Sequence, residues 1–190
     1  MTKTYSVLAF AVIFGLFTPE MYAQEKGAGD RVGGIRIGYH SSQFASDGEF
    51  YGEPMQSFYV GLFRDTKIIP LLHFGSGLEY YKNGVKIDDS NKRELHYLTV
   101  PLDLKLKLGP VFALGGFSPS FKVAERLTIA GNTAKPTDAR KAEWFDIPFF
   151  LGAGVKIWFV SIEARYHWGI MEVTDGYKSQ SFQFGAGISF

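Results

Sequence analysis

The side chains that could do chemistry in this sequence are, first, its four histidines, His40, His73, His96 and His167. A metal-binding element usually carries two histidines at a short fixed spacing, and no two of these four are spaced in that way. The chain also has no cysteine, which excludes thiolate metal sites and disulfides. We therefore expect no metal centre. We interpret His73 and His167 as hydrogen-bonded polar residues and His40 as a solvated residue at a strand end.

Other motifs lack the context that their chemistry requires. The segments 152–154 and 185–187 are glycine-rich, but neither is followed by a helix signal, so neither predicts a phosphate-binding loop. Asp88, Asp89 and Asn91 could hold Ca²⁺, but their spacing is not that of a calcium-binding loop, and we interpret them as a solvated turn. We expect no cofactor.

A set of charged residues shows a more informative pattern, because each of them alternates with apolar residues in an extended segment. Five are basic and three are acidic, and mixed signs favour pairing, since an unpaired buried charge is costly. We hypothesise an interior polar network that plugs the molecule and conducts little or no current; an ion path is the alternative. The set is Arg36, Glu79, Asp103, Lys105, Lys107, Lys156, Glu163 and Arg165.

The elements that must position these charges are β-strands. Between Leu98 and Leu108, apolar residues at every second position alternate with Thr99, Pro101, Asp103, Lys105 and Lys107. A period of two sustained over this length predicts a strand long enough to cross a bilayer. Similar patterns predict eight strands: Val32–His40, Ser57–Arg64, Leu71–Lys82, Glu94–Leu108, Val111–Phe121, Phe145–Ile157, Phe159–Trp168 and Gln180–Phe190. The pattern does not fix which face of the fifth strand points inward.

The predicted connections alternate in length, which is typical of a membrane barrel with short periplasmic turns and long outer loops. The long connections are Ser41–Gln56, Asn83–Arg93, Lys122–Trp144 and Gly169–Ser179. The short ones are Asp65–Pro70, Gly109–Pro110 and a turn around Ile157–Trp158. The sequence therefore predicts an all-β fold, a single closed antiparallel up-and-down transmembrane β-barrel of about eight strands, with both termini on the periplasmic side.

Periodicity alone does not separate a membrane barrel from a soluble barrel that binds an apolar ligand inside. The composition of the second face decides, because it holds glycine, serine and single charges and lacks the dense polar covering of a soluble surface. Aromatic residues also lie near the ends of the apolar faces, as expected at the polar boundary of a bilayer. These residues are Tyr39, Tyr80, Tyr166, Trp168 and Phe190.

The first residues predict export. Lys3 precedes an apolar stretch from Tyr5 to Phe17, and Ala23 offers a small residue at a cleavage position. Thirteen apolar residues are too few for a membrane-spanning helix. We therefore expect a signal peptide at residues 1–23 and a barrel domain at residues 24–190, located in the bacterial outer membrane. The net charge of +1, without a basic run, argues against nucleic acid as a partner.

Several segments resemble the PorT-like outer-membrane β-barrel family. They are Leu95–Gly109, Pro110–Phe121, Asp146–Pro148, Leu151–Val155 and Ile162–Tyr166. The resemblance covers most of residues 32–190 and implies an outer-membrane barrel of a gram-negative bacterium with no shared catalytic residues. One family member is implicated in protein secretion. The final Phe190 resembles the C-terminal aromatic signal of such barrels, which implies the barrel-assembly machinery as a partner during biogenesis.

We expect the protein to act as a structural or interaction protein through its outer loops, and not as an enzyme. The expected partners are outer-membrane lipid, lipopolysaccharide and a protein bound through the loops. The segment Lys122–Trp144, rich in lysine and arginine, is either a mobile polar loop or a binding surface for such partners. A secretion or transport component and a soluble periplasmic barrel are alternatives. A rim enzyme is a further one, with candidate residues His40, Ser41, Ser42, Asp47 and Asp175.

Overall fold

The computed structural model describes residues 31–46, 49–88, 91–129, 132–134, 144–174 and 177–190. These residues form strands and turns without a helix, so no described helix is long and apolar enough to cross a membrane. The expected signal peptide at residues 1–23 lies outside the described residues and stays a prediction. The strands are β1 (Arg31–Ser46), β2 (Glu49–Ile69), β3 (Leu72–Asp88), β4 (Asn91–Thr99), β5 (Leu102–Leu108), β6 (Val111–Phe117), β7 (Ser120–Ile129), β8 (Asn132–Ala134), β9 (Phe145–Asp146), β10 (Phe149–Ile157), β11 (Val160–Thr174) and β12 (Tyr177–Ser189).

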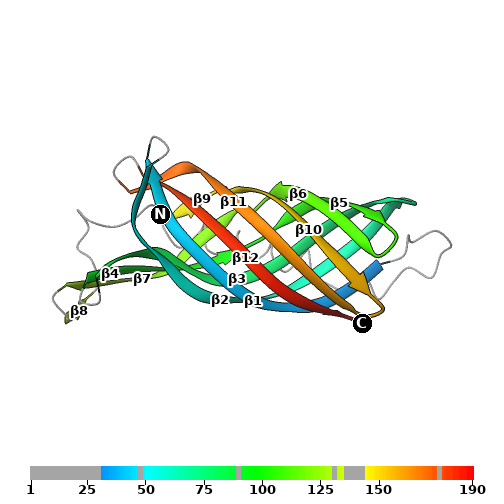
Figure 1. The fold of residues 1–190 in the computed structure, drawn as a ribbon, viewed down its shortest axis with the longest axis horizontal. Coiled ribbons are helices and arrows are strands. Elements are labelled where there is room, and N and C mark those ends of the chain that lie inside the picture. The colour runs from blue at the N-terminus through cyan, green and yellow to red at the C-terminus, as the bar shows by residue number, and fades with distance from the viewer. Residues whose placement is uncertain (1–30, 47–48, 89–90, 130–131, 135–143, 175–176) are drawn as a thin grey trace, which may run out of the picture.

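The strands close into one antiparallel barrel, as predicted (Figure 1). Three barrel strands are each made of two consecutive segments, β4 with β5, β6 with β7, and β9 with β10, which gives eight strands around the wall. β1 pairs with β2 on one side and with β12 on the other, and this second pairing closes the wall. Closure leaves no open edge within the hydrocarbon, where an unpaired backbone group would cost several kcal/mol.

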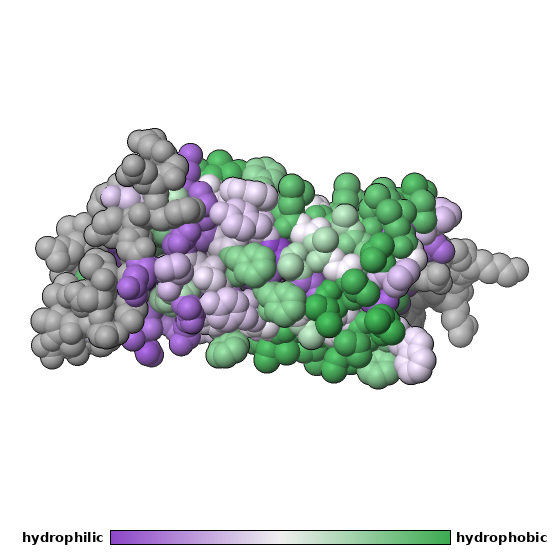
Figure 2. Space-filling view, viewed as in Figure 1, coloured by the Kyte–Doolittle hydropathy of each residue, from purple (hydrophilic) through white to green (hydrophobic). Residues whose placement is uncertain are grey.

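Apolar side chains cover the outside of the barrel and polar ones fill its inside. Leu104 is 52% exposed, whereas its chain neighbours Asp103 and Lys105 are buried. The space-filling view shows the apolar surface concentrated toward the end of the barrel that carries the short turns, while the opposite end is polar (Figure 2). This arrangement confirms the membrane barrel and excludes the soluble alternative, in which the apolar face would line the interior.

The strand whose orientation the sequence left open is β6. Phe112 and Leu114 are buried inside the barrel, and Val111 and Phe117 face outward. Phe112 and Leu114 pack with Phe150 from the neighbouring β10. The fifth barrel strand thus places aromatic and aliphatic side chains in the lumen, which the alternation of its residue types does not reveal.

The prediction of long outer loops was wrong for most of the residues concerned, which lie in strands. Residues 41–56 form the ends of β1 and β2, with only 47–48 outside the described residues, and residues 83–93 and 169–179 are likewise mostly strand. β2 has 21 residues and β3 has 17, against the roughly 9–11 that cross a bilayer. Beyond the lipid both faces of a strand can be polar, so the period of two disappears although the strand pairing continues.

A line of prolines crosses three neighbouring strands where the apolar band ends. Pro101, Pro119 and Pro148 separate β4 from β5, β6 from β7 and β9 from β10. Each proline carbonyl accepts a hydrogen bond from the preceding barrel strand, and the bonds are Gly77 N to Pro101 O at 3.0 Å, Val100 N to Pro119 O at 2.9 Å and Ser118 N to Pro148 O at 2.9 Å. Because proline donates no hydrogen bond in return, the ladder weakens along this line without losing its register.

Placing a charge on the lipid-facing side of the apolar band should destabilise the barrel. We expect Leu104→Lys to lower the free energy of unfolding by about 2–4 kcal/mol, because the ammonium would sit near the middle of the bilayer. Chemical unfolding in phospholipid vesicles, followed by tryptophan fluorescence, measures the change. Val123→Lys is the matched control, since Val123 is 57% exposed on β7 beyond the proline line, and its effect should stay within about 0.5 kcal/mol. Equal effects of both substitutions would contradict the assignment of the lipid-facing band.

Candidate functional site

Four charged side chains meet in the middle of the lumen. Glu79 Oε1 lies 2.9 Å from Arg36 Nε and 2.9 Å from Arg165 Nη1, and Glu163 Oε1 lies 2.9 Å from Arg36 Nη1 and also pairs with Arg165 Nη2. All four side chains are at most 5% exposed. Two arginines and two glutamates balance in charge, so their mutual attraction offsets much of the cost of removing them from water. We call these residues the central quartet.

A second ion cluster lies closer to the short turns. Asp65 accepts hydrogen bonds from Lys105 Nζ at 2.9 and 3.0 Å, and Lys107 Nζ lies 3.1 Å from its Oδ2. Asp65 is absent from the predicted network because a short connection was expected at Asp65–Pro70, whereas β2 continues to Ile69. The sequence did contain a sign of its position, because Asp65 follows Tyr59 and Phe63 at alternate positions of β2, all of which point inward.

The remaining two residues of the predicted network form no ion pair among the described residues. Asp103 is buried beside Gly75, where a side chain would collide with the carboxylate, and its Oδ1 has no hydrogen-bond partner. Lys156 Nζ donates to Ser189 Oγ at 3.0 Å. The structure thus gathers the eight predicted residues inside the barrel in two ion clusters and two separate positions.

The histidines occupy separate places, and His40 is not where we expected it. His40 is completely buried and stacks on the Tyr81 ring at 4.6 Å, so the prediction of a solvated strand end was wrong. His167 Nε2 lies 3.1 Å from Gln183 Oε1, inside the lumen as predicted. His96 is bonded to the Tyr80 hydroxyl. No group of metal-ligating side chains occurs among the described residues.

The candidate rim enzyme residues are not assembled in the described part of the chain. Ser42 is buried in the lumen, where its hydroxyl accepts a hydrogen bond from Gly84 N at 3.0 Å, and His40 is buried on the same strand. Asp47 and Asp175 lie outside the described residues. Neither Ser42 nor His40 therefore reaches the rim, where we had placed them.

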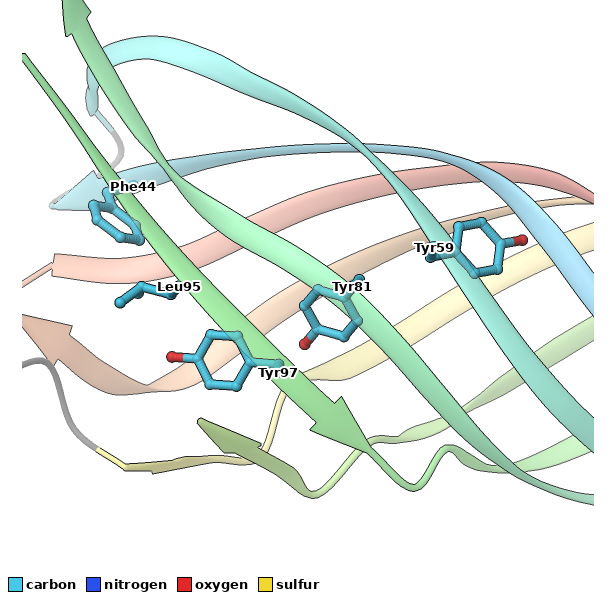
Figure 3. Packing of buried hydrophobic residues seen from close by; sticks show 5 residues of the cluster. All are labelled: Phe44, Tyr59, Tyr81, Leu95 and Tyr97. Carbon is cyan, nitrogen blue, oxygen red and sulfur yellow. The ribbon is translucent and has the colours of Figure 1, made fainter. Parts of the chain in front are cut away.

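Aromatic side chains fill the outer half of the lumen above the central quartet. Phe44, Tyr59, Tyr81, Leu95 and Tyr97 form one buried cluster, shown in Figure 3. Tyr81 and Tyr97 stack at 5.8 Å. The Tyr81 hydroxyl is 3.2 Å from Ser120 Oγ, which ties the cluster to β7. The lumen is therefore closed by packed rings as well as by ion pairs.

A third ion cluster lies on the strand extensions beyond the proline line. Glu125 Oε1 lies 2.6 Å from Arg93 Nη2, and Lys122 Nζ lies 2.5 Å from Glu125 Oε2. Burial alone would raise the pKa of Glu125, but the hydrogen bonds from Lys122 and Arg93 outweigh it and hold that pKa below its ordinary value. Lys122 and Glu125, which we had expected in a loop, thus lie on β7 and fasten it to β4.

The opposite face of the same extensions carries cations toward the outside. Leu95 and Tyr97 of β4 point inward, so Lys92 and Glu94 lie on the outer face, where Lys92 Nζ lies 3.4 Å from Glu94 Oε1. In the strand register Arg126 of β7 stands opposite Glu94, and Lys82 of β3 stands opposite His96. The Lys92 side chain is 42% exposed. Three cations against one carboxylate make this face basic, and we call Lys82, Lys92 and Arg126 the outer basic patch.

Comparisons with known proteins agree with this architecture. A family model described as outer membrane protein beta-barrel domain matches residues 22–175. No curated protein matches the sequence. Among solved structures, Ail of Yersinia pestis in complex with the heparin analogue sucrose octasulfate is 17% identical, with 85% of this chain and 99% of that chain covered and a TM-score of 0.51. Neisserial surface protein A is 14% identical, with 83% and 97% covered and a TM-score of 0.58. At these identities the likeness shows the fold.

Removing one member of the central quartet should cost far more than removing a surface cation. We expect Arg165→Met to lower the free energy of unfolding by about 3–5 kcal/mol, because it leaves the buried carboxylates of Glu79 and Glu163 short of a partner. Lys178→Met, at an exposed position on β12, should change it by less than about 0.5 kcal/mol. Guanidinium unfolding in detergent micelles gives both values. A loss below 1 kcal/mol for Arg165→Met would show that the quartet contributes little.

The third ion cluster, formed by Arg93, Lys122 and Glu125, should make the stability of the β4–β7 pairing depend on pH. Since the folded pKa of Glu125 is depressed, its contribution is complete above the ordinary glutamate pKa of about 4.3 and is lost as the pH falls through the lower folded value. Amide hydrogen exchange, corrected for intrinsic rates, should therefore show β4–β7 amides losing protection below about pH 4 while β11–β12 amides keep theirs. Glu125→Gln should remove the dependence and give weak protection at every pH. An equal loss of protection in the β4–β7 and β11–β12 amides would contradict the conclusion that Glu125 causes the pH dependence.

Proposed function

Because this chain belongs to the outer membrane protein beta-barrel domain family, we propose that it is a non-conducting barrel of the bacterial outer membrane that binds anionic groups of lipopolysaccharide through its outer end. The outer basic patch is the single observation that carries this proposal. Lys82, Lys92 and Arg126 are held on paired strands just beyond the apolar band, at the height where lipopolysaccharide phosphates would lie.

The strand pairing beneath the patch supports binding by the strands themselves. β3, β4 and β7 pair side by side, and on their inner face Arg93 and Lys122 hold Glu125. Cations on paired strands lose less conformational freedom on binding than cations on a free loop. The interaction role that we had expected of the loops therefore falls to the strand extensions.

The filling of the lumen supports the absence of conductance. The central quartet and the aromatic cluster of Phe44, Tyr59, Tyr81, Leu95 and Tyr97 follow one another along the barrel axis, and their members are buried. An ion path needs a continuous polar channel with water, whereas rings and paired charges occupy this cross-section.

The structurally similar Ail was solved with sucrose octasulfate, a polyanion. That likeness gives only the fold. Sulfate and phosphate groups are nevertheless recognised by the same side chains, lysine and arginine, and the outer basic patch is suited to both. The narrower PorT-like assignment, and with it a role in a secretion assembly, stays a prediction. A stable protein partner that co-purifies after mild detergent extraction would favour that second role.

Binding to purified lipopolysaccharide tests the proposal. We expect the double substitution Lys92→Gln and Arg126→Gln to weaken binding in detergent micelles about tenfold or more, since each phosphate contact with a cation contributes about 1 kcal/mol. Added salt should also weaken the binding of lipopolysaccharide by the wild-type protein. Lys178→Gln, which removes a cation from β12 at the same end, is the matched control and should bind like the wild type.

Two outcomes would overturn the proposal. One is binding that is unchanged by the double substitution or equally weakened by the control. The other is a steady, large single-channel current from the purified protein in planar bilayers, which would require an open path through the lumen.

A further inference from the structure

A small cavity opens in the lumen between the central quartet and the short turns. Its lining includes Lys105, Lys107, Lys156, Ser161 and Ser189, with Phe63 and Phe112 forming apolar walls. The free space holds about one water molecule, so the cavity is a shallow recess. On the side away from the turns, Arg36 and Glu163 of the central quartet close it.

The charges around this recess do not balance. Four basic residues line it, against the two carboxylates of Asp65 and Glu163. Glu163 is engaged by both arginines of the central quartet, and Asp65 is shared by Lys105 and Lys107. Lys156 has no carboxylate partner among the described residues and donates only to a hydroxyl. Arg36 and Glu163 are balanced within the neutral quartet, so the remaining cations, Lys105, Lys107 and Lys156, face the carboxylates of Asp65 and of the buried Asp103 beside Lys105. One positive charge therefore remains in excess at this end of the lumen, where uncompensated charge is costly.

The polar groups at the mouth are mostly hydrogen-bond donors. Lys107 and Lys156 present ammonium groups, and Ser161 and Ser189 present hydroxyls, from β5, β10, β11 and β12. Donors that converge from different strands around a positive field are the arrangement that binds a tetrahedral oxyanion. Behind these donors, Lys105 Nζ is held by Asp65 and lies 5.0 Å from the centre of the Phe112 ring.

We propose that this recess is a phosphate-binding site that opens at the periplasmic end of the barrel, with Lys107 and Lys156 as its principal ligands. The phosphate sits at the mouth of the recess, where the flexible stems of both lysines adjust to it. The phosphate group comes either from a free anion of the periplasm or from the headgroup of a phospholipid in the inner leaflet. This site is independent of the outer basic patch, because the central quartet and the aromatic cluster lie between them.

The binding of inorganic phosphate to the folded protein in non-ionic micelles is the direct test. We expect phosphorus NMR titration to give saturable binding, and a tenfold excess over Kd to raise the unfolding temperature by about 2–4 °C relative to chloride of equal ionic strength. Lys156→Gln should weaken the binding at least tenfold, and Lys156→Arg should retain most of it. Lys156 forms no ion pair with another described residue, so Lys156→Gln leaves no described carboxylate without its partner and should fold. The altered gel mobility of the unboiled barrel verifies this.

A second arm separates the two sources of phosphate. Micelles doped with lysophosphatidylglycerol replace inorganic phosphate as the probe, and stabilisation by this lipid alone assigns the site to headgroups, whereas stabilisation by inorganic phosphate assigns it to free anions. Lys178→Gln is the control for a general charge effect and should leave both responses unchanged. Should neither probe stabilise the wild-type protein, or should Lys178→Gln weaken binding as much as Lys156→Gln, the proposal is overturned.

Discussion

The structure depends on the balanced burial of charge at the seam where the first and last strands meet. Arg36 comes from β1, Glu79 from β3, and Glu163 and Arg165 from β11, so the central quartet spans the β1–β12 pairing that closes the wall. These ion pairs can form only in the closed barrel. Conversely, an open barrel would expose backbone groups and unpaired charges to hydrocarbon. Closure and charge pairing therefore stabilise each other.

The part of the fold that lies within lipid could be predicted from sequence, because the bilayer imposes a strict alternation there. Leu104 and Asp103 differ in environment as the pattern required, and the same alternation placed Arg36, Glu79 and Arg165 inside. What alternation cannot supply is the partner of each charge. Lys105 and Lys107 depend on Asp65, which was missed because a turn was assumed where β2 continues.

Outside the lipid the same reasoning failed for a physical reason. Once water replaces hydrocarbon, both faces of a strand tolerate polar residues, and the extensions of β2 and β3 resemble loops in sequence. The prediction that His40 is solvated failed for another reason. Its residue type suggests solvent, but it lies in phase with Arg36 and Ser42 on β1, and that phase points inward throughout. Phase along a strand was therefore the better guide than residue type.

The lumen is divided along its axis into layers that differ in chemistry. A donor-rich recess with excess positive charge lies near the short turns, the neutral quartet lies in the middle, and packed rings fill the half toward the long strand ends. Because the two inner layers are closed and compensated, neither can take up a further ligand without losing contacts that hold the barrel together. Both anion sites that we propose therefore lie at the ends of the barrel, where Arg126 is exposed and Lys156 donates only to the Ser189 hydroxyl.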